Sequence, residues 1–181
     1  MKPIIAITLF VAAAFAAVPA QAINRPISDF FGSYVGRSIS VVGAGRSERD
    51  LNVVIKKHKK GGFTLDWTTV TRKADGSVKS KKYSINFAPT KRKGLYASAM
   101  RNNVFGGTVP LDPLQGDPYF WAGIDGDTLT VHALMIMDDG GYEMQIYERT
   151  LSADGLPLKF SRNRDGVLAR SVTGTLKKTA D

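Results

Sequence analysis

The feature that most restricts the fold is a series of short runs between residues 128 and 178 in which apolar and polar residues alternate. Asp-Gly or Gly-Gly pairs stand in the breaks between these runs. Glycine adopts positive φ angles at no steric cost, so such pairs between alternating runs are a strong signal for β-hairpins. The expected strands cover residues 128–137, 142–150, 156–162 and 167–178, and together they predict a β-meander.

The preceding part of the chain has the same pattern. Further strands are predicted at residues 32–42, 50–58, 63–72, 78–87, 95–100 and 119–124, whereas no long run has a clear helical period. Because nearly all connections are short, strands that follow one another are expected to pair. The expected fold is therefore all-β, an antiparallel up-and-down β-barrel of about 8–10 strands, in preference to a Greek-key sandwich.

In an up-and-down barrel, alternate connections lie at the same end. Five basic residues in two turns are therefore predicted to gather at one end: Lys59, Lys60, Lys91, Arg92 and Lys93. They form either a solvated surface or a patch that faces an anionic membrane. The segment 101–118, with three prolines and three glycines, breaks the strand pattern and is expected at the other end, as a lid or as a packed surface loop.

The first 22 residues have the organisation of a secretory signal peptide. Lys2 precedes an apolar stretch, and Ala20-Gln21-Ala22 is a small-x-small cleavage site. The apolar stretch is shorter than the roughly 20 residues that a membrane span needs. We therefore expect cleavage after Ala22, a single domain over residues 23–181, and export to the periplasm, where a chain without cysteine folds without disulfides.

The chain is basic, with a formal net charge of +9. This charge favours solubility and attracts anionic lipid, lipopolysaccharide or an acidic partner. Nucleic acid is not an expected partner in the periplasm. The oligomeric state is not indicated by the sequence.

Residues that could carry out catalysis or bind a metal are few. The two histidines, His58 and His132, lie on strands that need not be neighbours, and there is no cysteine. A zinc site needs three or four ligands, and no Gly-x-Ser-x-Gly motif of a hydrolase is present. We therefore expect neither a metal nor a cofactor, and a protein that is not an enzyme.

The interior of the predicted barrel is the most informative candidate site. Several large residues, some with a polar edge, are expected to point inward. A small barrel either fills its interior or keeps a pocket for one ligand, and both interpretations are open here. The residues expected to line a pocket are Trp67, Tyr83, Phe87, Tyr142, Met144 and Arg170.

The run Phe30-Phe31-Gly32-Ser33-Tyr34, directly before the first long strand, resembles the opening of the lipocalin/calycin family. In that family a helical turn leads to Gly-x-Trp; here Tyr34 stands at the Trp position. The resemblance implies that an arginine near the last strand, Arg170 or otherwise Arg162, packs over this aromatic ring. A strand count near ten is more similar to the fatty-acid-binding branch.

The expected function follows from the pocket and from this resemblance. The leading hypothesis is a periplasmic binding protein that holds a hydrophobic or lipid-like small molecule inside the barrel. The alternative is a cell-envelope interaction protein with a filled barrel, whose basic surface contacts anionic lipid, glycolipid or a protein partner.

Overall fold

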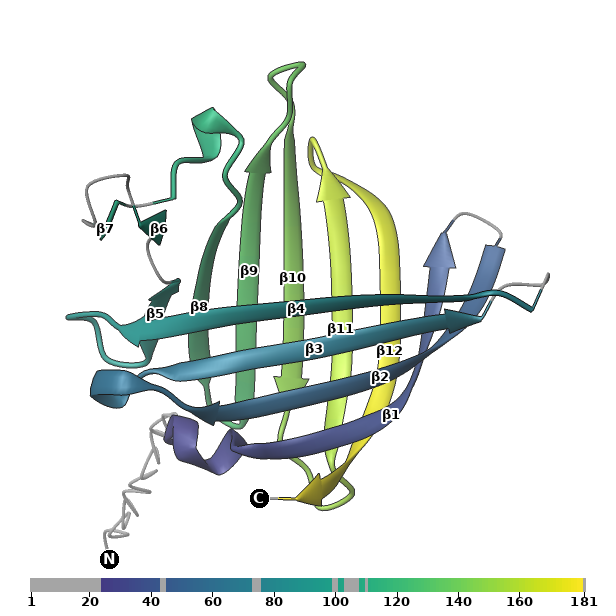
Figure 1. Ribbon diagram of the computed structural model, residues 1–181, viewed down its shortest axis with the longest axis horizontal. Helices are drawn as coiled ribbons and strands as arrows, with labels where there is room; N and C mark the ends of the chain where they lie inside the picture. The colour runs from purple at the N-terminus through teal and green to yellow at the C-terminus, as the bar shows by residue number, and fades with distance from the viewer. Residues whose placement is uncertain are drawn as a thin grey trace, which may run out of the picture.

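The computed structural model describes residues 24–42, 45–72, 76–98, 101–102, 108–109 and 111–180. The predicted signal peptide lies outside these residues. Ten antiparallel strands form one closed barrel, in which each strand pairs with its neighbours in sequence and the last pairs with the first (Figure 1). The prediction of an all-β, up-and-down barrel is confirmed.

The barrel strands are long, and most begin and end where the sequence pattern predicted. Their bounds are β1 Gly32–Val42, β2 Gly45–Lys57, β3 Phe63–Arg72, β4 Val78–Pro89, β5 Leu95–Ser98, β8 Tyr119–Asp125, β9 Thr128–Ile136, β10 Tyr142–Thr150, β11 Leu156–Arg164 and β12 Val167–Ala180. The largest difference is in β2, which starts five residues earlier than expected because it pairs along the whole length of β1. Two short 3-10 helices, η1 (Ile27–Phe30) and η2 (Lys59–Gly61), precede β1 and β3.

The two halves of the barrel cross each other steeply. Strands β1–β4 run across the molecule in Figure 1, whereas β8–β12 run from top to bottom behind them. The short strand β5 joins the halves by pairing with both β4 and β8. We call the end with the turns at 59–62, 88–94, 125–127 and 152–155 the closed end, and the other end the open end.

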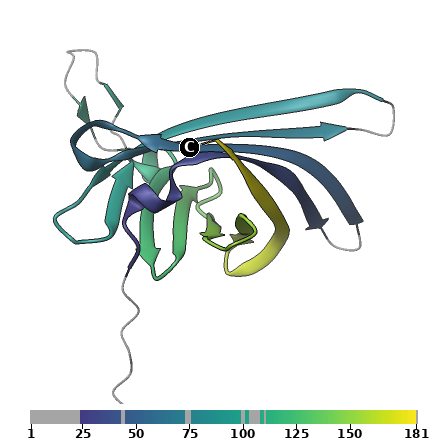
Figure 2. The same cartoon turned by 90° about the horizontal axis from the view of Figure 1, so that it is seen from below.

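Strand β4 is paired on both sides over only a short part of its length. Residues 87–89 of β4 pair with β5, whereas residues 78–87 of β4 pair with β3. Among the described residues, the half of β4 from Val78 to Asn86 therefore has one sheet neighbour. Figure 2 shows β3 and β4 projecting together beyond the rest of the barrel. The barrel wall is consequently incomplete beside this half of β4.

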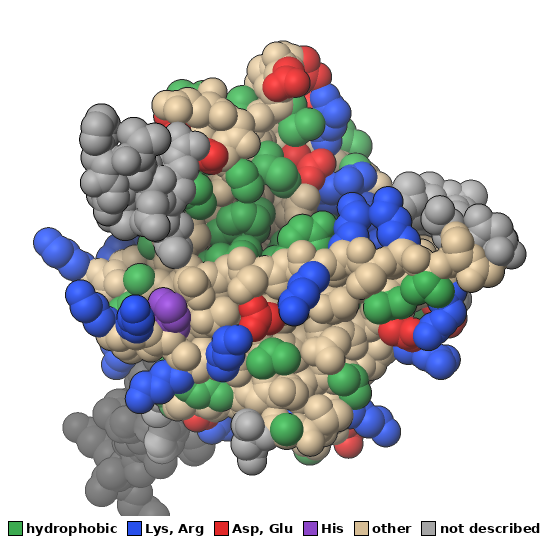
Figure 3. Space-filling model, in the orientation of Figure 1, with side chains coloured by type: hydrophobic (Ala, Val, Ile, Leu, Met, Phe, Trp, Pro, Cys, Tyr) green, Lys and Arg blue, Asp and Glu red, His purple; other side chains and the backbone are tan. Residues whose placement is uncertain are grey.

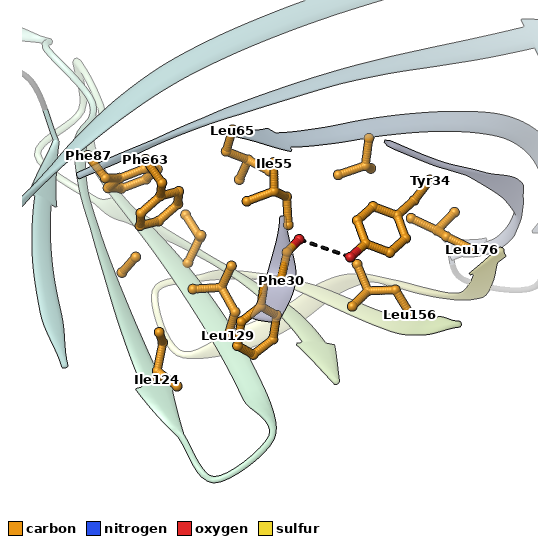
Figure 4. Packing of buried hydrophobic residues seen from close by; sticks show 13 residues of the cluster. Phe30, Tyr34, Ile55, Phe63, Leu65, Phe87, Ile124, Leu129, Leu156 and Leu176 are labelled. Atoms are coloured by element: carbon orange, nitrogen blue, oxygen red, sulfur yellow. Dashed lines mark hydrogen bonds between the residues drawn. The ribbon is translucent and has the colours of Figure 1, made fainter. Parts of the chain in front are cut away.

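The closed end is filled by an apolar core. Thirteen buried residues form one cluster, in which Phe30 comes from η1 and Tyr34, Phe63, Phe87 and Leu129 come from strands of the barrel wall (Figure 4). The rings of Phe63 and Phe87 stack with their centroids 4.8 Å apart. The Tyr34 hydroxyl, itself buried, donates a hydrogen bond of 2.9 Å to the Phe30 carbonyl oxygen and so fixes η1 against the core.

The arginine that the family resemblance implied does not pack on Tyr34. In the ladder between β1 and β12, Tyr34 lies opposite Lys178, whereas Ser40 lies opposite Val172. The Arg170 Nε donates instead to the Ser40 Oγ at 2.8 Å. Six residues of strand, roughly 20 Å, separate Tyr34 from Ser40. The expectation for Arg170 is therefore wrong, and Arg162, opposite Arg170 on β11, is equally distant along the sheet.

The segment 101–118 is more regular than the sequence suggested. It contains a small antiparallel pair, β6 (Arg101–Asn102) and β7 (Thr108–Val109), and the 3-10 helix η3 (Pro113–Gln115). The Asp112 side chain caps η3 by accepting a hydrogen bond from the Leu114 N–H. A part of this segment lies outside the described residues, so its role as a lid stays a prediction.

Gly36 offers a test of how tightly the barrel closes. A Cβ atom at this position would stand 2.2 Å from the Thr175 carbonyl oxygen of β12, so that β1 and β12 would have to separate. Gly36→Ala should therefore lower the free energy of unfolding by about 1–3 kcal/mol, the usual cost of overpacking. Urea unfolding followed by circular dichroism measures this change.

Gly123→Ala is the matched control. There the new Cβ would meet only the Leu95 Cδ2 at 3.3 Å, a side-chain atom that can move. An equal loss of stability in both variants would show that close contact at the seam between β1 and β12 is not what restricts Gly36.

Candidate functional site

The lining of the barrel changes from apolar to cationic between the closed and the open end. On β2 the inward residues pass from Ile55 and Val53 to Arg49, and on β11 from Leu158 to Arg162. Alternation places every second residue on the inner face, so each of these series lies along one strand. The interior is therefore neither wholly filled nor wholly hollow: a core occupies the closed end, and a cavity occupies the open end.

The cavity has a volume of about 430 Å³. This value lies within the range of small-molecule sites. Strands β1–β4 and β10–β12 contribute its walls. The lining residues are Ser38, Arg49, Leu51, Val53, Trp67, Thr69, Thr71, Lys79, Lys81, Tyr83, Gln145, Tyr147, Arg149, Leu158, Phe160, Arg162, Arg170 and Val172.

Aromatic side chains from both walls meet across the cavity. Trp67 on β3 stacks on Tyr83 of β4, with centroids 4.9 Å apart and planes 18° apart. On the opposite wall, Tyr147 of β10 contacts Phe160 of β11 at 4.6 Å. Trp67 and Tyr147 approach each other to 5.8 Å. The four rings thus form a continuous apolar surface that a hydrocarbon or a flat ring system can contact.

A hydrogen-bonded series orients the polar groups on β10. The Tyr147 hydroxyl donates to the Gln145 Oε1 at 2.6 Å, and the Gln145 Nε2 donates to the Glu143 Oε1 at 2.6 Å. The other Glu143 oxygen lies 3.6 Å from the Arg162 Nε. Burial raises the pKa of Tyr147 to about 12, so this phenol is neutral and serves as a donor at physiological pH.

Arg149 is a buried cation that forms no ion pair with a carboxylate of the described residues. Its side chain is 2% exposed, and within the described residues its Nε and Nη1 atoms have no hydrogen-bond partner. Its guanidinium carbon lies 5.7 Å from the centre of the Tyr147 ring, a cation–π contact. Burial lowers the pKa of Arg149 to about 10, so the group keeps its charge at neutral pH. This unpaired charge weakens the fold unless an anion joins it.

Three further arginines stand together toward the open end. Arg162 and Arg170 are opposite each other in the ladder between β11 and β12. Burial, and then the positive charges of Arg49 and Arg162, lower the pKa of Arg170. In the described part of the chain, the buried Nε atoms of Arg49 and Arg162 have no hydrogen-bond partner. The three groups therefore create a region of positive potential inside the barrel.

The cavity opens beside the singly paired half of β4. In the space-filling view the molecule is hollowed between β4 and the strands behind it, and Lys and Arg side chains gather on one side of the hollow (Figure 3). Lys79, Lys81 and Tyr83 are exposed residues of β4 and also line the cavity. A ligand can reach the interior here without separation of any strand pair that the structure shows.

Three of the six predicted pocket residues lie on the cavity, and ligand binding by them stays a prediction. Trp67, Tyr83 and Arg170 line the cavity. Phe87 does not, because it lies four residues beyond Tyr83 on β4, toward the closed end, and is fully buried against Phe63. The prediction for Phe87 was correct in its inward direction and wrong in its depth.

Tyr142 and Met144 are on the outer face of β10, so their prediction as pocket residues is wrong. The inward residues of this strand are Gln145, Tyr147 and Arg149. The hydrophobic pattern misled, because the outer face of β10 is more apolar than its inner face. A shift by one residue exchanges the two faces of a strand.

Sequence reasoning also missed five cations that line the cavity. These are Arg49, Lys79, Lys81, Arg149 and Arg162. For four of them the signal was present, since each has the same parity as the apolar inward residues of its strand. For Arg149 it was absent, because the apolar residues of β10 have the opposite parity. Charged residues at such positions are usually assigned to solvent, however, because burying them without partners is unfavourable.

The basic residues of the predicted surface lie at the closed end. Lys59 and Lys60 belong to η2, and Lys91, Arg92 and Lys93 to the turn between β4 and β5. The two turns are neighbours, since a Cβ on Gly61 would lie 3.9 Å from the Pro89 Cγ. All five side chains are exposed. The predicted gathering is therefore present.

The two histidines are apart. His58 precedes η2, with its Nδ1 3.4 Å from the Thr64 Oγ1, whereas His132 on β9 stacks on Trp121 at 4.7 Å. Burial lowers the pKa of His132. In the ranges that the structure describes, no three His, Cys, Asp or Glu side chains are grouped as metal ligands are, and no helix has the length and apolarity of a membrane span.

No protein-family model matches the chain, and no curated protein matches its sequence.

Arg149 provides a stability test of the site. Arg149→Met keeps most of the side-chain volume and removes a buried, unpaired charge, so the free energy of unfolding of the ligand-free protein should rise by about 1–3 kcal/mol. Chemical denaturation in the absence of ligand measures the effect. Arg164→Met is the control, because Arg164 is exposed and its ion pair with Asp139 should contribute less than about 1 kcal/mol. A destabilised Arg149→Met variant would mean that the guanidinium is already compensated in the free protein.

Proposed function

We propose that the protein is a non-enzymatic binding protein that holds a hydrophobic or lipid-like small molecule inside the barrel. The observation that carries this proposal is the 430 Å³ cavity between the aromatic walls formed by Trp67 and Tyr83 on one side and Tyr147 and Phe160 on the other. Concave, largely pre-formed sites with an apolar lining and a few polar groups are typical of ligand binding.

The polar groups of the interior also support binding without catalysis as the proposed function. The polar side chains that line the cavity are six cations, two phenols, the hydroxyls of one serine and two threonines, and the Gln145 amide. Glu143 is hydrogen-bonded to Gln145 beside Arg162. General acid–base catalysis needs a group whose pKa lies near the working pH. Arg149 and Tyr147, at about 10 and about 12, do not fit that requirement. The proposed location is the periplasm, on the basis of the signal-like first 22 residues.

Fluorescence tests the proposal directly. The chain has two tryptophans, so Trp121→Phe leaves Trp67 as the reporter of the cavity. A neutral apolar dye, N-phenyl-1-naphthylamine, and a dansyl-labelled fatty acid should bind with one site per chain and quench Trp67. Failure of both probes to bind would overturn the proposal.

A cavity-filling pair of variants locates the binding site. Thr69 lines the cavity, whereas Thr68 points to the opposite face of β3. Thr69→Trp should weaken probe binding at least about tenfold by occupying the space, and Thr68→Trp should leave it unchanged. Equal binding by both variants would place the probes outside the barrel.

A second function is favoured by the gathering of Lys59, Lys60, Lys91, Arg92 and Lys93 at the closed end. In this alternative the protein uses the basic surface to contact an anionic lipid or glycolipid of the cell envelope, or a protein partner. Sedimentation with phosphatidylglycerol vesicles should show binding that weakens steeply between low and physiological salt, because exposed charges are screened. Replacement of all five residues by glutamine should abolish it. Binding that resists salt and this replacement would exclude the basic surface as the contact.

A further inference from the structure

We propose that the ligand of the cavity carries a group with two negative charges, such as a phosphate monoester, on an apolar body. This inference rests on the proposed function, since it assigns a chemical class to the molecule that the cavity holds. It arises from the charges that line the cavity, which a neutral lipid would leave without partners.

The charges in and around the cavity are strongly unequal. The described residues that line the cavity include no aspartate or glutamate. Six lining residues are cationic: Arg49, Lys79, Lys81, Arg149, Arg162 and Arg170. Glu143 lies 3.6 Å from Arg162 and compensates one of them. The Tyr147 phenol remains protonated and supplies no negative charge. Five cations therefore remain, and a singly charged ligand would compensate only one of them.

The positions of the arginines favour one compact anion with several oxygen atoms. Arg162 and Arg170 are cross-strand partners, and Arg49 is close enough to influence the charge of Arg170. Arg170 is held by its hydrogen bond to Ser40, which orients its guanidinium. Guanidinium groups bind phosphate oxygens through paired N–H donors. Three of them at one level of the barrel offer more donors than a single carboxylate, with two oxygens, can accept.

The buried nitrogen atoms indicate that this site is incomplete without an anion. Within the described residues, the Nε atoms of Arg49, Arg149 and Arg162 are buried and have no hydrogen-bond partner. Buried donors of this kind are uncommon in native proteins because leaving them unpaired is unfavourable. A phosphate-like group in the cavity would accept hydrogen bonds from the arginines at its level. Arg149 lies two inward positions deeper than Arg162, opposite Leu158, and contributes attraction from below.

The apolar body follows from the aromatic rings between the arginine level and the core. Tyr147 and Phe160 are the inward residues next to Arg149 and Arg162 on their strands, and Trp67 lies 5.8 Å from the Tyr147 ring. An amphipathic anion places its charged group among the arginines and its body against these rings. Lys79 and Lys81, exposed beside the opening, raise the local concentration of anions and so accelerate entry.

A series of ligands with one common body tests the charge. Calorimetric titration at pH 8 would compare 2-naphthol, 2-naphthoate, 2-naphthyl phosphate and inorganic phosphate. At this pH the phosphate monoester is a dianion, since its second pKa is about 6. We expect 2-naphthyl phosphate to bind at least about tenfold more tightly than 2-naphthoate, and 2-naphthoate more tightly than 2-naphthol, because hydrogen bonds between charged groups are stronger than those between neutral groups.

Variants assign the effect to the cavity. Lys81→Gln should weaken the binding of 2-naphthyl phosphate several-fold and leave 2-naphthol unchanged. Lys82→Gln is its matched control, because Lys82 points outward and is near Asp66. Arg162→Gln should cause a larger loss, about tenfold or more. If Arg162→Gln does not fold, as judged by circular dichroism, the comparison of Lys81→Gln with Lys82→Gln tests the inference, because both lysines are exposed.

The outcomes separate this inference from the proposed function. If 2-naphthol or 2-naphthoate binds as tightly as 2-naphthyl phosphate, the inference of a doubly charged ligand is wrong and the proposed binding of an apolar molecule stands. If inorganic phosphate binds as tightly as 2-naphthyl phosphate, the body contributes nothing, and the hydrophobic site is wrong. If none of the four binds, both are overturned. Equal effects of Lys81→Gln and Lys82→Gln would also overturn the cavity as the anion site.

Discussion

The ladder between β1 and β12 is the interaction on which the structure depends. It joins the first strand of the barrel to the last, and with it an open sheet becomes a closed one. The strands approach so closely that neither Gly36 nor Gly174 has room for a Cβ atom, which would stand 2.2 and 2.5 Å from backbone oxygens of the opposite strand. Closure removes the edges that a long sheet would expose, and it gives every strand a common interior.

A closed interior has two uses, and this barrel separates them along its axis. The closed end holds the thirteen-residue core, which includes the hydrogen-bonded Tyr34 and Phe30. Burial of these side chains is the main source of stability. The open end contains like charges and empty volume, and Arg149, deeper in the barrel opposite Leu158 and Leu129, is unpaired among the described residues; each of these is unfavourable for the ligand-free fold. Sites that recognise ligands commonly oppose stability in this manner, since their groups are arranged for a partner that is absent.

The sequence predicted the fold more completely than the site for a specific physical reason. Turn residues such as Asp-Gly restrict the backbone locally, so the bounds of Phe63–Arg72 and Tyr142–Thr150 could be predicted without knowledge of the rest. The face that a strand turns inward is decided by the closed barrel as a whole. On β3 the apolar residues point inward and Trp67 was found, whereas on β10 the inner face is Gln145, Tyr147 and Arg149. A cationic interior inverts the pattern from which inward faces are normally inferred.

Strand β4 shows how the opening and the charge depend on each other. A half-paired strand exposes backbone donors and acceptors that could pair with another chain, and charged side chains, lysine above all, prevent this. Lys82 lies on the outer face near Asp66. Lys79 and Lys81 point inward beside Tyr83, where they protect the strand edge and also add to the positive charge of the cavity. Under the proposed function, the part of β4 that pairs with β3 alone borders the entrance, and the positive charge of Lys79 and Lys81 continues inward to Arg49, Arg162 and Arg170. The gap in the wall and the charge of the lining then belong to the same site.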